Sequence, residues 1–147
     1  MAGVEIDATG DGSGSGSGYG YGDGSGYGGS YKSYWLATIP YFSSKWPLEQ
    51  QKRLAELQHT STVIAFWKSD KHGRACNGGG FEKSVKPGTV QVISGPLEVC
   101  TRRALHATML PPRWKGDRLW IVALIGEFQR KEDKYGALTR EIIGECL

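Results

Sequence analysis

The sequence predicts an α+β fold: a small mixed or antiparallel sheet with one or two helices, preceded by a glycine-rich extended arm. Three observations predict it. Short runs rich in β-branched and aromatic residues recur from residue 62 to the C-terminus, and residues 43–59 have the leucine spacing of a helix. Glycine occupies every even position from Gly10 to Gly28, which is incompatible with a packed core there.

The arm is predicted to cover residues 1–30 and a single α+β domain residues 31–147, because the composition changes abruptly near Ser30. Twelve of the 22 glycines lie before that point. On an extended backbone the alternation would turn all non-glycine side chains to one face, so Tyr19, Tyr21 and Tyr27 are the predicted arm contacts. A plain linker and a docked or self-associating arm both fit this pattern.

Residues 31–46 are rich in aromatic side chains and are expected to anchor the arm to the body. In the predicted helix, Ser43 or Ser44 can act as the cap, Pro47 suits the first turn, and Leu54 and Leu57 share a face. Strands are predicted at residues 62–68, 88–94, 97–108 (two short strands with a turn), 119–128 and 139–147. The run at 119–128 is continuously apolar, which indicates burial on both faces.

Charge is unevenly distributed along the chain. Residues 1–30 hold four acidic and no basic residues, whereas the remainder holds 18 basic and 11 acidic residues, a net charge of +7. Such a body is compatible with a nucleic acid, a nucleotide or an acidic protein as partner, and also with an ordinary solvated surface. We expect no membrane partner and a cytoplasmic location, since neither a spanning run nor a signal peptide is recognisable.

Three cysteines, an odd number, argue against a secreted disulfide framework. Cys76, Cys100, Cys146 and His106 have the donor types of a zinc site, but no two cysteines have the close spacing typical of one. These four residues are the metal candidates, and small buried thiols are the alternative interpretation of the cysteines. No phosphate-binding loop has the required spacing either, so we expect neither a metal nor a cofactor.

Residues 95–128, GPLEVCTRRALHATMLPPRWKGDRLWIVALIGEF, and 132–145, EDKYGALTREIIGE, resemble an uncharacterised family of small phage, prophage and bacterial proteins. The shared order is G-P-L-x-x-C, then L-H-A-T, P-P-x-W-K-G and W-x-V-A-L-x-G-E, and the likeness covers about residues 63–147. A Gly/Asp/Ser/Tyr-rich arm precedes this body in close relatives. The resemblance implies a phage or prophage setting, with association with a virion as a second location, but it brings no activity.

The strand at 119–127, preceded by a short strand and a proline loop, is also faintly similar to ADP-ribosyltransferases, which bind NAD between such strands. On that interpretation His106 and Glu127 are the catalytic candidates. Alternation would turn His106 toward a cleft beside Arg102 and Arg103, and the alternative is a hydrogen-bonded structural histidine. Glu127 could instead pair with a basic residue on an adjacent strand.

Basic residues interleaved with an aromatic one can hold phosphates and stack a base, which makes one loop a candidate binding site. The same composition describes a loop fixed by a buried tryptophan with its charges in water. The predicted binding residues are Arg102, Arg103, Arg113, Trp114, Lys115 and Arg118.

Two functions follow from these patterns. The first is a non-catalytic interaction or structural protein of phage type, whose body docks on a protein partner and whose arm serves assembly. The alternative is a nucleotide- or NAD-binding enzyme.

Overall fold

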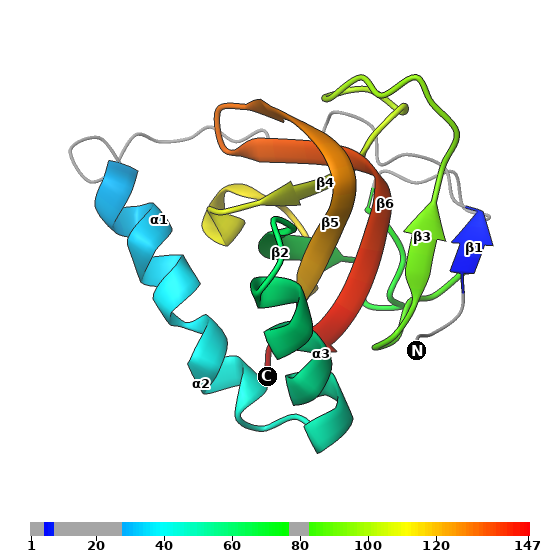
Figure 1. Ribbon diagram of the computed structural model, residues 1–147. Coiled ribbons are helices and arrows are strands. Elements are labelled where there is room, and N and C mark those ends of the chain that lie inside the picture. The colour runs from blue at the N-terminus through cyan, green and yellow to red at the C-terminus, as the bar shows by residue number, and fades with distance from the viewer. Residues whose placement is uncertain (1–4, 8–27, 77–82) are drawn as a thin grey trace.

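The structure, a computed structural model, describes residues 5–7, 28–76 and 83–147, and for residues 5–7 and 28–32 it describes the backbone alone. The described helices are α1 (Gly28–Ala37), α2 (Ile39–Ser43) and α3 (Leu48–Gln58), with a 3-10 turn at Pro111–Arg113. The strands are β1 (Glu5–Asp7), β2 (Val63–Ser69), β3 (Val90–Val92), β4 (Leu105–Thr108), β5 (Arg118–Lys131) and β6 (Lys134–Glu145) (Figure 1). The broad α+β class is therefore as predicted, although strands predominate.

The sheet is closed by β6, which pairs along both of its edges. One edge pairs with β5 in a long antiparallel hairpin. The other edge pairs first with β4 and then with β3. Because β2 joins β5 to β4, the strands β2, β4, β5 and β6 form a small closed barrel. Beyond it, β3 carries β1 in parallel, which makes the sheet mixed.

The barrel interior is filled by one face of each strand. On β5, Trp120, Val122 and Leu124 point inward, while Ile121 and Ala123 point outward to the helices. The prediction that the run at 119–128 is buried on both faces is confirmed for these five residues. It is wrong for the end of the run, where residues 126–128 are exposed. An interior packed with side chains leaves the barrel as a core rather than a channel.

A helical layer covers the outer face of β2, β5 and β6. Leu54 and Leu57 of α3 pack with Phe66 and Ile143, as their helical spacing predicted. Trp46 lies flat over Gly144 and donates a hydrogen bond from Nε1 to the carbonyl oxygen of Glu145 at 2.8 Å. The missing side chain at Gly144 is what admits the indole ring so close to the strand.

Two sequence predictions about the helices are wrong. The helix α3 begins at Leu48, because Pro47 has an extended ψ of 153° and ends the preceding turn, so neither Ser43 nor Ser44 caps it. Residues from Gly28 onward form α1 and α2, separated only by Thr38, so residues 28–30 of the predicted extended arm are helical. The predicted arm contacts Tyr19, Tyr21 and Tyr27 lie outside the described residues.

Within the described ranges, no helix combines the length and the apolar character needed to cross a membrane.

The contact between Trp46 and Gly144 gives a test of how the helical layer is held. We predict that Gly144→Ala lowers the free energy of unfolding by about 1–3 kcal/mol, since the new methyl group would overlap the indole ring. In a Trp46→Leu background the same substitution should cost much less. Urea unfolding of the four proteins measures both values, and equal costs in the two backgrounds would contradict this packing.

Candidate interaction site at the sheet edge

The outer strands β3 and β1 present the part of the sheet that is not closed into the barrel. Their pairing is parallel, with Glu5 opposite Val90 and Asp7 opposite Val92. On β3 the side chain of Gln91 is buried, whereas Val90 and Val92 are only half-buried. Because the buried side chain of β3 is polar and its two valines are only half-buried, β3 is held in place more by specific polar contacts than by burial of apolar surface.

Those contacts come from Arg140, which is fully buried on β6. Its Nε donates to Oε1 of Gln91 and its Nη1 to the carbonyl oxygen of His106, both at 2.8 Å. Its guanidinium lies 4.1 Å from the centre of the Trp67 ring, a cation–π contact. Arg140 therefore ties β6 to β3, β4 and β2 at once, and it fixes the register of β3.

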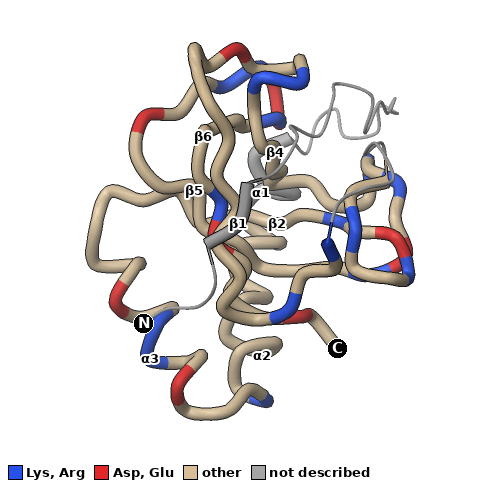
Figure 2. The backbone as a smooth tube through the Cα atoms, turned by 90° about the vertical axis from the view of Figure 1, so that its right-hand side faces the viewer, with Lys and Arg blue, Asp and Glu red and all other residues tan. Residues whose placement is uncertain are grey.

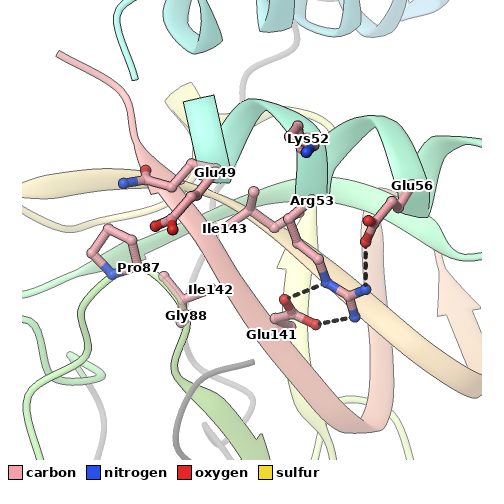
Figure 3. Close-up of a pocket in the computed structure, with 10 residues that line it drawn as sticks. Glu49, Lys52, Arg53, Glu56, Pro87, Gly88, Glu141, Ile142 and Ile143 are labelled. Atoms are coloured by element: carbon pink, nitrogen blue, oxygen red, sulfur yellow. Dashed lines mark hydrogen bonds and ion pairs between the residues drawn. The ribbon is translucent and has the colours of Figure 1, made fainter. Parts of the chain in front are cut away.

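A groove of about 480 Å³ lies beside the start of β3, between α3 and the turn at residues 86–88, with β6 as its floor (Figure 3). Its lining carries both carboxylates and basic side chains. Its lining residues are Glu49, Gln50, Lys52, Arg53, Glu56, Pro87, Gly88, Glu141, Ile142 and Ile143.

The centre of the groove is the ion pair between Arg53 on α3 and Glu141 on β6. Two hydrogen bonds of 2.8 Å join the guanidinium Nε and Nη2 to the carboxylate, and Nη1 reaches Glu56 at 3.1 Å (Figure 3). The Glu141 side chain is only 3% exposed, against 40% for Arg53. Hydrogen bonding to Glu141 raises the pKa of Arg53 above its ordinary value and outweighs the opposite effect of burial, so the guanidinium stays charged.

His106 does not face a cleft, contrary to one sequence prediction. It is 1% exposed, and its Nε2 accepts a hydrogen bond of 2.8 Å from the backbone N–H of Cys100. Arg102 and Arg103 are both exposed in the preceding turn. This geometry matches the alternative of a structural histidine that orders the turn at residues 97–103.

The two catalytic candidates are not brought together either. Glu127 is exposed at a register shift of β5, beside Gly126 with a φ of +87°. On β6, Gly136 is paired with His106 of β4 on one side and with Gln129 of β5 on the other. The strand β6 therefore lies between His106 and the part of β5 that carries Glu127. The described residues therefore do not assemble an acid–base pair from His106 and Glu127.

The proline-rich loop is fixed by Trp114, which is buried in the barrel core and cannot stack on a base. Its basic residues differ in their surroundings. Arg113 contacts Asp133 at 3.4 Å, Arg118 makes two 2.8 Å hydrogen bonds with Glu145, and Lys115 is exposed. Figure 2 shows basic and acidic residues interspersed along the chain in this view, without one continuous basic stripe.

Of the cysteines and histidine proposed as metal ligands, Cys100 and His106 are in contact, through the backbone N–H of Cys100 rather than its thiol. Cys76 is exposed, while Cys100 and Cys146 are half-buried free thiols. Burial, helped by the charge of Glu145, raises the pKa of the Cys146 thiol to about 12, so it is protonated at neutral pH. Over the described parts of the chain, no three His, Cys, Asp or Glu residues are placed to hold a metal ion together.

Sequence reasoning missed Arg140 and the Arg53–Glu141 pair. The signal for Arg140 was a lone arginine inside the otherwise strand-forming run at residues 139–147. Nothing in the sequence pointed to its partner Gln91.

Comparison of the chain with family models, curated proteins and solved structures gives no match.

The ion pair between Arg53 and Glu141 should contribute to the stability of the fold. We expect Glu141→Gln to lower the free energy of unfolding by about 1–3 kcal/mol, because it weakens charged hydrogen bonds at a buried carboxylate. Glu56→Gln, at an exposed carboxylate on the same arginine, should change it by less than about 0.5 kcal/mol. Chemical unfolding measures both, and similar losses for the two variants would show that burial of Glu141 does not matter.

Proposed function

We propose that the protein is a non-catalytic interaction protein of phage or prophage type, whose body docks on a protein partner and whose glycine-rich arm serves assembly.

The observation that carries this proposal is the position of β1. Strand β1 belongs to the start of the arm, yet it pairs with β3 on the edge of the body's sheet. Strand addition to a sheet edge is a common mode of protein recognition, since backbone hydrogen bonds provide the affinity. An arm that begins with such a strand is suited to docking, whereas a plain linker has no need of one.

The helical segment next to the arm gives further support. Trp35, Ile39 and Phe42 turn toward the body, and Trp35 packs edge-to-face on Phe66 at 5.8 Å. On the other side, Tyr34 and Tyr41 are 60% and 61% exposed. Exposed aromatic side chains on helices packed against a domain are favourable contact residues for a protein partner.

The residues that an enzyme would use have structural roles instead. His106 orders a turn, Trp114 fills the core, and Arg118 is held by Glu145. These contacts favour the interaction protein over the nucleotide-binding alternative.

Removing the arm tests the proposal. A chain lacking residues 1–27 retains all of α1, so we expect it to keep the native circular dichroism spectrum while losing self-association or partner binding. Light scattering coupled to gel filtration would show the mass falling to that of one shortened chain. An unchanged mass relative to the full chain would contradict a role for the arm in assembly.

A finer variant asks which arm side chains contribute. Replacing Tyr19, Tyr21 and Tyr27 by serine should weaken assembly, since the rings offer most of the arm's apolar surface. Replacing Ser13, Ser15 and Ser17 by alanine is the matched control and should have little effect. Equal effects of the two sets would show that tyrosine packing is not what holds the arm.

A further inference from the structure

The position of β3 in the sheet does not depend on its pairing with β1. Its inner edge is paired with β6, from Val90 opposite Glu141 to Val92 opposite Thr139. Backbone hydrogen bonds extend this pairing past both ends, from Gly88 N–H to the Ile142 carbonyl oxygen and from Ile93 N–H to that of Leu138.

The contact between Gln91 and Arg140 anchors the same strand from the side-chain face. None of these contacts involves β1. If β1 leaves, β3 therefore stays in place and exposes a row of unpaired backbone N–H and C=O groups, which is a template for another strand.

The connection between β1 and α1 is long enough to allow pairing within one chain or between two copies. In Figure 1 the start of α1 and the strand β1 lie on opposite sides of the barrel. Residues 8–27 join them, and twenty residues span at most about 70 Å when fully extended. A connection long enough to pass from one side of the barrel to the other is also long enough to reach a neighbouring copy.

The pairing itself is also easily exchanged. Only three residues of β1 are matched with β3, and so short a ladder contributes little by itself. The same backbone pairing forms whichever copy supplies the strand, so exchange between copies has a small energetic cost, as in domain swapping.

We propose that the outer edge of β3 takes β1 from a second copy of this chain, so that the arms are exchanged between copies. This inference rests on the proposed function and names the partner of the arm. Reciprocal exchange closes a twofold dimer, in which each copy donates one strand and accepts one. If each copy instead donated its strand to one neighbour and accepted a strand from another, the copies would form an open linear polymer.

Intermolecular crosslinking tests the exchange. In a background with Cys76, Cys100 and Cys146 replaced by serine, one protein carries Glu5→Cys and a second carries Val90→Cys, since these positions are opposite one another. The two proteins are unfolded together, refolded as an equal mixture and oxidised. We expect a disulfide-linked dimer containing one of each chain, at least about tenfold more abundant than with the control Lys131→Cys in place of Val90→Cys.

A third protein with both Glu5→Cys and Val90→Cys in one chain completes the test. If this protein crosslinks within single chains and the mixture gives no mixed dimer, β1 belongs to its own copy and the exchange is wrong. If no crosslink forms in either sample, β1 does not occupy β3 and the exchange is also wrong. Light scattering of the chain lacking residues 1–27 separates this failure from that of the proposed function, since the arm could still assemble through its tyrosines.

Discussion

The fold depends on β6 having partners along both edges. Its hairpin with β5 provides one continuous edge, and the other edge is divided between β4 and β3. The barrel closes because β4 takes the first part, and the sheet continues outward because β3 takes the second. Arg140 lies where the division occurs and contacts side chains or backbone from β2, β3 and β4. The helical layer also depends on β6, through Trp46 over Gly144.

The sequence predicts the elements better than their arrangement. The apolar runs of β2 and β5 and the spacing of Leu54 and Leu57 carry a local signal, because burial on one or both faces sets the residue pattern. Barrel closure has no such signal, since it depends on pairings between residues far apart in the chain. The helices α1 and α2 were also missed, because an aromatic-rich segment containing Pro40 has weak helical preference.

The candidate site was missed by the sequence analysis because it consists of backbone groups rather than side chains. Residues chosen by chemical type, such as His106, Trp114 and Arg118, use their polar or aromatic groups to stabilise turns, core and strand ends. A sheet edge recognises its partner mainly through backbone groups, which every residue carries. Such a site has no characteristic residue, and only the strand pairing reveals it.

The division of the β6 edge also bears on the order in which the chain folds. The β5–β6 hairpin joins neighbouring segments and needs only a two-residue turn at Glu132 and Asp133. Each later pairing closes a larger loop, and β1 on β3 closes the largest within one chain, so its entropic cost is highest. Folding should therefore proceed outward from the hairpin, with β1 added last.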